Sequence, residues 1–493
     1  LQFKKKDFIL KKAILSSILL LGTTSILADT TMCFKENHSS MSTIENIPLN
    51  GGACAGKFSV NDMKKQGWAV DDIKISDLVL LNTCTVREGA AVKVYGKLGE
   101  LKKLKEKRNN MIIGVTGCLA QEVREEFIKR TPFVDLVIGN QNIAKLPDII
   151  EKIQKGTVDH IVMVEDEDEL PKRVDADFGD DIVASVSITY GCNNYCTFCI
   201  VPYVRGMERS VPMREILDDV KQYADKGYKE ILFLGQNVNS YGSDRIEMGE
   251  DFAGLLTKAA NIEGDFWLKY ISPHPKDFTD SVIKAIAENP KVARMLHLPL
   301  QSGSSRVLKE MNRRYTKESY LALVDRIREK LPDISLTTDI IVGFPGETEE
   351  DYISSREFVK KVKFAELHVF KYSKRDGTVA AKMPNQIDEK IKTLRSEDLI
   401  KTGEELTKEF RQAKIGQDTT VLFEEKILLD NKEYWVGHTV DYIKIAVPEK
   451  ENLEGQIRKV NVKDFLTNEI MLAPGPLSVF CRYLITPWYF SGN

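Results

Sequence analysis

The feature that most constrains the fold is an alternation of short apolar runs and amphipathic stretches over residues 182–410. Helical stretches, including residues 213–226, 278–288 and 317–330, lie between the apolar runs. Strands that alternate with helices pair in parallel and are covered on both faces. The pattern therefore predicts an α/β fold with a barrel-like sheet of six parallel strands, whose sequences are VASVSIT, EILFLGQ, FWLKYIS, MLHLPLQ, SLTTDIIVG and AELHVFKYS.

A cysteine-rich loop directly follows the first of these strands. It reads YGCNNYCTFCIVPYVRG and places Cys192, Cys196 and Cys199 within eight positions. Thiolates at these spacings can hold one corner of an iron–sulfur cluster. A tetrahedral zinc ion would need a fourth ligand nearby, but the next cysteine is Cys481 and the next histidine is His274. A cubane iron–sulfur cluster held by three cysteines leaves one iron without a protein ligand, so a small molecule can bind there. The alternative interpretation of the loop is a zinc knuckle or a disulfide loop.

This CxxxCxxC loop, with Phe198 before its last cysteine, resembles the signature of the radical S-adenosylmethionine (SAM) enzymes. The resemblance implies a 4Fe-4S cluster on the three cysteines, which would form the catalytic centre, with SAM bound at the open iron. In that family an electron from the cluster splits SAM to give a 5′-deoxyadenosyl radical. The resemblance also implies that the predicted sheet is a partial (β/α)6 barrel.

Further segments resemble the SAM contacts of this family, and each follows or ends a predicted strand. Glycines let the backbone approach a ligand, and amides and hydroxyls bind its polar groups. Ordinary turn chemistry is the alternative for each segment taken alone. Arg205 and Arg209 can face an anionic substrate or hold the SAM carboxylate, with a surface role as the alternative. The predicted cofactor-binding residues are Gly235, Gln236, Asn237, Gln301, Ser302, Ser304, Asp339 and Gly343, with Phe344 and Pro345 along the adenine.

Two more cysteines lie behind apolar runs further upstream. Residues 78–81 and 111–115 predict two parallel strands, each followed by a helix. Cys84 and Cys118 come just past the strand ends, at the edge where α/β sheets hold ligands. Residues 134–139 predict another short strand. From the residues alone, a pair of buried core thiols is the alternative.

The segments around these two cysteines, NTCTVRE and GVTGCLAQE, resemble two of the three cysteine motifs of the methylthiotransferases. The resemblance implies a second, auxiliary 4Fe-4S cluster held by Cys84, Cys118 and a third cysteine. The first motif of that family is absent, and Cys54 in GGACAGKFSVND is the candidate for the third ligand. Without the strand that accompanies this motif, we expect an exposed sheet edge in the N-terminal domain.

The 493 residues exceed what one hydrophobic core supports. Lysines followed by an apolar run in residues 1–28 are typical of a signal peptide and not of a membrane span. The sparse, clustered cysteines indicate reduced, metal-binding thiols, which are typical of a cytosolic protein. A signal peptide would instead export the chain, so we interpret about the first 70 residues as a foreign leader. The predicted parts are the leader (1–28), an unassigned and possibly foreign segment without a clear strand or helix period (29–75), a partial methylthiotransferase N-terminal domain (76–170), a radical SAM domain (177–410), a β domain (411–473) and an unassigned tail (474–493).

The β domain at residues 411–473 consists of short alternating strands, which predicts a small β-barrel. It resembles the TRAM module, an RNA-binding appendage of tRNA-modifying enzymes. Tyr434, Trp435 and His438 can stack on bases, with core packing as the alternative for the tryptophan. The formal net charge of −3 provides no overall attraction to nucleic acid.

Over about residues 76–473 the chain is similar to the methylthiotransferases, and GQNVNSYG resembles their tRNA-modifying branch. The resemblance implies conversion of N6-isopentenyladenosine beside the tRNA anticodon to its 2-methylthio derivative. It also implies an electron donor such as flavodoxin or ferredoxin, and a cytoplasmic monomer that does not bind a membrane. The alternatives are a ribosomal-protein aspartate methylthiotransferase, a catalytically impaired RNA-binding protein with an incomplete auxiliary cluster, and an exported protein.

Overall fold

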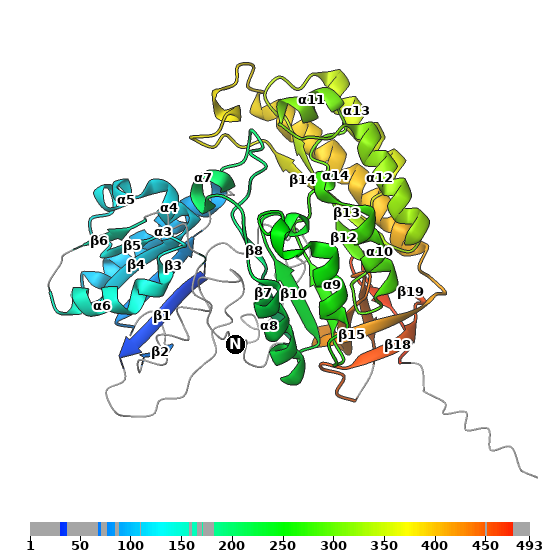
Figure 1. Ribbon diagram of the computed structural model, residues 1–493, viewed down its shortest axis with the longest axis horizontal. Helices are drawn as coiled ribbons and strands as arrows, with labels where there is room; N and C mark the ends of the chain where they lie inside the picture. The colour runs from blue at the N-terminus through cyan, green and yellow to red at the C-terminus, as the bar shows by residue number, and fades with distance from the viewer. Residues whose placement is uncertain are drawn as a thin grey trace, which may run out of the picture. The chain divides into compact units, whose positions relative to one another are not determined.

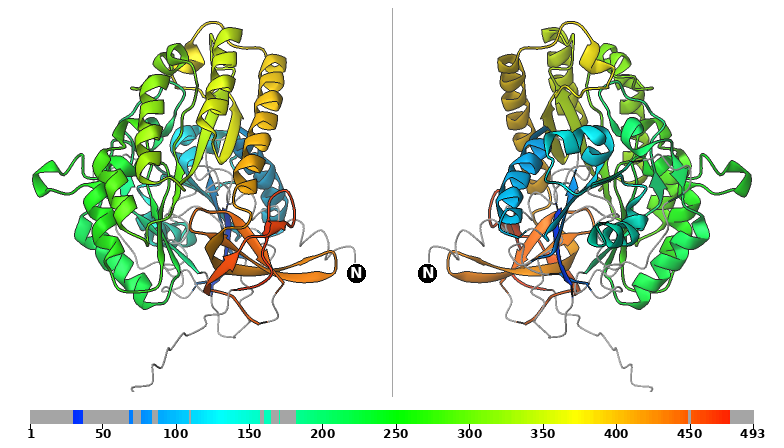
Figure 2. Two further views of the ribbon diagram at one scale, coloured as in Figure 1. Left: turned by 90° about the vertical axis from the view of Figure 1, so that its right-hand side faces the viewer. Right: turned by 90° about the vertical axis from the view of Figure 1, so that its left-hand side faces the viewer.

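The chain forms two compact units, Leu1–Thr407 and Lys408–Asn493. The predicted leader, Cys54, Cys84 and the tail beyond residue 476 lie outside the described residues. The computed structural model (Figures 1 and 2) describes residues 30–36, 68–70, 76–83, 88–108, 110–156, 160–164, 170, 182–448 and 451–476.

The N-terminal part of the first unit contains a six-stranded sheet with the order β2-β1-β3-β4-β5-β6. The strands from β3 onward are parallel, so the three predicted strands of this region are confirmed. A fourth parallel strand, β6, was not predicted. The parallel strands are β3 (Leu78–Thr83), β4 (Ile112–Gly117), β5 (Leu136–Ile138) and β6 (Ile161–Met163).

The expectation of an exposed edge at β3 is wrong. β1 (Thr30–Glu36) pairs with β3 in antiparallel orientation, and β2 (Trp68–Val70) pairs with β1. Residues 29–75, whose sequence shows no clear strand or helix period, therefore contain two strands of this sheet. The ladder from β1 supplies the backbone hydrogen-bond partners that an unpaired β3 would lack.

Both faces of this sheet are covered by helices. Val79 and Leu81 share a hydrophobic core with α3 (Glu88–Lys105), whereas Leu78 and Leu80 share another with α6 (Leu146–Gln154). Successive strand residues point to opposite faces, so a strand buried on both sides must be apolar throughout. The short helices α4 (Cys118–Val123) and α5 (Glu125–Arg130) follow β4.

The barrel of the first unit contains the six predicted strands. They form two parallel three-stranded ladders, β11-β10-β7 and β12-β13-β14. A parallel bridge between Leu268 and Val292 links β11 to the chain just before β12. The strands are β7 (Val183–Ser187), β10 (Glu230–Leu234), β11 (Trp267–Tyr270), β12 (Met295–His297), β13 (Ser335–Val342) and β14 (Glu366–Lys371).

Helices alternate with these strands and lie on the outside of the barrel (Figure 2). Thr279, Thr316 and Thr348 each accept a backbone hydrogen bond at a helix start, which satisfies donors that have no partner within the helix. No helix in the described part of the chain has both the length and the apolar character to cross a membrane. The main helices are α8 (Met213–Asp225), α9 (Phe252–Ala260), α10 (Asp280–Glu288), α11 (Ser305–Glu310), α12 (Lys317–Lys330), α13 (Glu349–Val362) and α14 (Glu389–Gln412).

The second unit is a six-stranded, largely antiparallel sheet with the order β18-β15-β16-β17-β20-β19, which confirms the predicted strand-rich domain. Trp435 lies in its hydrophobic core, so the prediction that this ring stacks on bases is wrong and the packing alternative is right. Tyr434 is also buried. His438 Nδ1 donates to Glu424 Oε2 at 2.7 Å, and its ring stacks on Tyr442. The strands are β15 (Asp418–Leu429), β16 (Lys432–Thr439), β17 (Lys444–Val447), β18 (Ile457–Asn461), β19 (Asp464–Phe465) and β20 (Met471–Leu472).

Candidate metal centre

The cysteine loop leaves the barrel after β7 and is closed by a two-stranded ladder. β8 (Thr189–Tyr190) pairs with β9 (Arg209–Ser210), and the loop between them includes α7 (Val201–Arg205). At its base, Gly191 has a φ of +77°, and an added Cβ would lie 2.0 Å from the carbonyl oxygen of Met207. A glycine is therefore required for the two sides of the loop to approach each other.

The three cysteines of this loop are free thiols. Burial, supplemented by the neighbouring Cys196, raises the pKa of Cys199 to about 12, and burial also raises the pKa of Cys192. Both thiols are therefore protonated near neutral pH. Metal binding must displace their protons, which couples cluster assembly to deprotonation.

The ligand set of the loop favours a cluster over a single zinc ion. Cys196 and Cys192 both contribute to the raised pKa of Cys199, so the three thiols lie near one another. Residues 190–210 contain no histidine and no fourth cysteine, so the loop lacks the four ligands of a structural zinc ion. A cluster held by three cysteines fits this ligand set better.

Arg313 is a residue of this site that the sequence analysis did not single out. Its buried guanidinium donates from Nη1 to Cys196 Sγ at 3.3 Å and from Nη2 to the Pro299 carbonyl oxygen at 3.0 Å. Its Nε donates to Tyr315 Oη at 2.8 Å. No carboxylate of the described residues forms an ion pair with it. A buried cation without an acidic partner is costly, and an anionic iron–sulfur centre at Cys196 would offset its charge.

The residues predicted after the second barrel strand lie against this loop. Gln236 Oε1 accepts a hydrogen bond of 2.7 Å from the Gly191 amide. An added Cβ on Gly235 would lie 2.2 Å from Thr189 Oγ1, so this position also permits a close approach. Asn237 donates to Asp277 Oδ2 at 2.8 Å. The structure therefore brings this predicted group to the base of the cysteine loop.

The residues predicted after the fourth strand form a tight turn beside α13. Gln301 adopts a φ of +71°, which is uncommon for a residue with a side chain. Ser302 Oγ lies 3.2 Å from Ser355 Oγ, and Ser304 Oγ donates to Asp351 Oδ1 at 2.6 Å. These two hydroxyls fasten the turn to α13 and are therefore engaged within the protein.

Near the fifth strand, Gly343 has a φ of +73° and its amide donates to Glu347 Oε2 at 2.7 Å. The Phe344 ring is fully buried against Tyr372 in a hydrophobic cluster. The prediction that Phe344 lies along the adenine is therefore wrong, because its ring belongs to the core.

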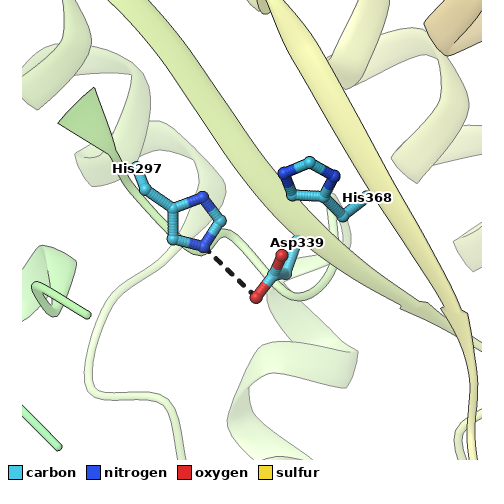
Figure 3. A group of neighbouring side chains, drawn as sticks. All are labelled: His297, Asp339 and His368. Atoms are coloured by element: carbon cyan, nitrogen blue, oxygen red, sulfur yellow. Dashed lines mark ion pairs between the residues drawn. The ribbon is translucent and has the colours of Figure 1, made fainter. Parts of the chain in front are cut away.

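Asp339 belongs to a polar cluster inside the barrel, together with His297 and His368 from the neighbouring strands (Figure 3). His297 Nε2 lies 3.3 Å from Asp339 Oδ2, while its Nδ1 is 2.9 Å from Thr337 Oγ1. Burial favours a protonated carboxyl, but His297 and then His368 outweigh it and hold the pKa of Asp339 below its usual value. Asp339 thus provides a buried carboxylate to the barrel interior, and the three ligand atoms are close enough to hold a metal ion.

Of the upstream cysteines, Cys118 is described and lies at the predicted sheet edge. It is the first residue of α4 and packs with Ile200 and Val204 of the cysteine loop. Asn140 Nδ2 donates to its sulfur at 3.5 Å. Thr83, the residue before Cys84, is in register with Gly117, the residue before Cys118. Cys84 and Cys54 themselves lie outside the described residues.

Replacing Gly117 with alanine tests whether the close approach of Gly117 to Thr83 stabilises this edge of the sheet. Gly117 has a φ of +96°, and an added Cβ would lie 2.1 Å from the Thr83 carbonyl oxygen. We expect the free energy of unfolding to fall by about 1–3 kcal/mol, measured by urea denaturation. Gly156→Ala is the control, because Gly156 has a φ of +64° with no atom within 4 Å. Equal losses in the two variants would show that the contact with Thr83 is unimportant.

Comparison with known families agrees with this site. A model of the radical SAM superfamily matches residues 186–359, which contain the cysteine loop and most of the barrel. A model described as uncharacterized protein family UPF0004 matches residues 57–139, including part of the segment left unassigned above. The fold and the match define a radical SAM protein, whose cofactors are a 4Fe-4S cluster and SAM.

Similar curated proteins specify the family further. A protein of Fusobacterium nucleatum named tRNA-2-methylthio-N(6)-dimethylallyladenosine synthase is 53% identical over 397 residues, which is 80% of this chain and 91% of that protein. Proteins of the same name from Caldicellulosiruptor saccharolyticus and Clostridium botulinum are 45% and 44% identical, covering 72% and 73% of this chain and 75% and 81% of theirs. The chain belongs to this family of radical SAM methylthiotransferases.

Proposed function

We propose that this protein converts N6-isopentenyladenosine beside the tRNA anticodon to its 2-methylthio derivative. The observation that carries the proposal is the 53% identity to the Fusobacterium nucleatum protein named tRNA-2-methylthio-N(6)-dimethylallyladenosine synthase. The matched region covers 91% of that protein. The cysteine loop on the partial barrel supports it, because it provides the chemistry that an unactivated C–H bond requires.

We assign Cys192, Cys196 and Cys199 as the ligands of the radical SAM cluster. Their CxxxCxxC pattern and the buried cation at Cys196 support this assignment. When bound, the cluster and SAM supply the radical that removes hydrogen from C2 of the adenine. Gln236 contacts the loop at Gly191, and Arg313 contacts it at Cys196, so both residues position the loop on the barrel.

We assign Cys84 and Cys118, with Cys54 as the candidate third ligand, to the auxiliary cluster that supplies sulfur. The contact of Cys118 with Ile200 and Val204 supports a location beside the radical SAM loop. The predicted SAM-binding set stays a prediction and consists of Gly235, Gln236, Asn237, Gln301, Ser302, Ser304, Asp339 and Gly343. We further propose a cytoplasmic monomer that receives electrons from a flavodoxin or ferredoxin, with a C-terminal TRAM domain that contacts tRNA.

The function is tested by complementation of a bacterial deletion strain followed by mass spectrometry of tRNA nucleosides. We expect the deletion strain to accumulate N6-isopentenyladenosine and the complemented strain to recover the 2-methylthio nucleoside. Recovery of a methylthiolated ribosomal protein with no change in tRNA would favour the ribosomal-protein alternative. Periplasmic accumulation of the protein would contradict the cytoplasmic location.

A further inference from the structure

We propose that Tyr195 and Tyr203 form an aromatic platform on which an unpaired base of the RNA substrate stacks beside the metal centre. This inference rests on the proposed function and adds the residues that receive the RNA. Tyr195 is 46% exposed and Tyr203 is 49% exposed. Among the residues whose exposure the structure describes, they are the only exposed phenylalanine, tyrosine or tryptophan side chains, and both belong to the cysteine loop.

The two rings contact each other. Their centroids are 6.2 Å apart, and their planes make an angle of 83°. An edge-to-face pair of this kind is favourable in itself and orients both rings. We infer that a base can stack on the exposed face of one ring, while the second ring stands nearly perpendicular to it and borders the same site.

The backbone fixes the position of each tyrosine. Tyr195 adopts a φ of +46°, which is rare for a large side chain, and Asn312 Nδ2 donates to its carbonyl oxygen at 2.9 Å. Tyr203 lies on α7, whose Val204 is buried against Cys118 and Ile200. The buried side of α7 thus directs Tyr203 to the solvent, and a strained backbone kept at an exposed ring is typical of a functional position.

The location indicates what this platform binds. Tyr195 directly precedes Cys196, and Tyr203 follows Cys199 by four residues. A base that reacts at the radical centre must leave its own stack, and proteins commonly receive such bases on aromatic rings. An RNA with unpaired bases therefore fits the site better than a folded protein partner, which would bury a larger apolar patch.

The test measures binding of a fluorescent anticodon stem-loop RNA carrying N6-isopentenyladenosine to the cluster-loaded enzyme by anisotropy. We expect Tyr203→Ala to weaken binding roughly five- to 150-fold, because loss of one stacking ring costs that much. Tyr203→Phe should bind nearly as well as the wild type. Met248→Ala is the matched control, because Met248 is an exposed apolar side chain outside the loop, 68% accessible.

The outcomes separate this inference from the function on which it rests. If the wild-type enzyme does not bind the RNA, the proposed function fails. If the wild type binds and Tyr195→Ala and Tyr203→Ala bind equally well, only the platform is refuted. Slower reduction by flavodoxin with unchanged RNA binding would assign the rings to the electron donor and overturn the inference. Iron content confirms loading, and Tyr203→Ala alone decides the test if Tyr195→Ala does not assemble its cluster.

Discussion

Replacing Cys196 with serine should abolish formation of 5′-deoxyadenosine from SAM. Serine keeps the size of the side chain but cannot supply the thiolate that iron prefers. Cys196 also accepts the hydrogen bond from Arg313, so its loss leaves that buried cation without the sulfur. After anaerobic reconstitution we expect about four fewer irons per chain and SAM cleavage at the background of the iron-free protein.

Cys118→Ser is the matched control for this result. Cys118 is equally buried but belongs to the N-terminal sheet, so its loss should leave SAM cleavage intact while no methylthiolated RNA forms. Unimpaired SAM cleavage in Cys196→Ser would refute the assignment of the cysteine loop. Full methylthiolation by Cys118→Ser would refute the auxiliary ligand.

Replacing Arg313 with methionine should make the radical SAM cluster harder to reduce. The guanidinium is buried and lies 3.3 Å from Cys196 Sγ, where the surrounding protein screens its charge weakly. Reduction adds a negative charge, which a neighbouring cation stabilises. We expect the ratio of reduced to oxidised cluster at a fixed potential to fall about tenfold, equivalent to a shift of about 59 mV in the midpoint potential, measured by an EPR-monitored redox titration.

Arg313→Lys separates charge from geometry. Lysine keeps the charge but not the planar fork that reaches Cys196, Pro299 and Tyr315 together, so we expect an intermediate potential. An unchanged potential in Arg313→Met, combined with much weaker SAM binding, would show that Arg313 serves SAM instead of the cluster.

Most of the barrel was predictable because short strand-forming segments alternate regularly with amphipathic helices along residues 182–410. All six predicted strands are present, and the cysteine loop follows the first of them. β1 was missed because TTMCFKE contains few apolar residues and its pairing with β3 joins distant segments, such as Thr30 with Asn82. Composition within a short window does not reveal such a partner.

The cysteine spacing and the order of strands and helices, and hence the class of chemistry, can be predicted from the chain alone, because they depend on neighbouring residues. The position of Arg313 at Cys196 cannot, since the two residues are 117 positions apart in the chain. The packing of Trp435 and Phe344 into cores and the exposure of Tyr195 and Tyr203 likewise became visible only in the folded protein. Burial and long-range contact depend on how distant segments pack, and the identity of a residue does not encode which neighbours it will meet.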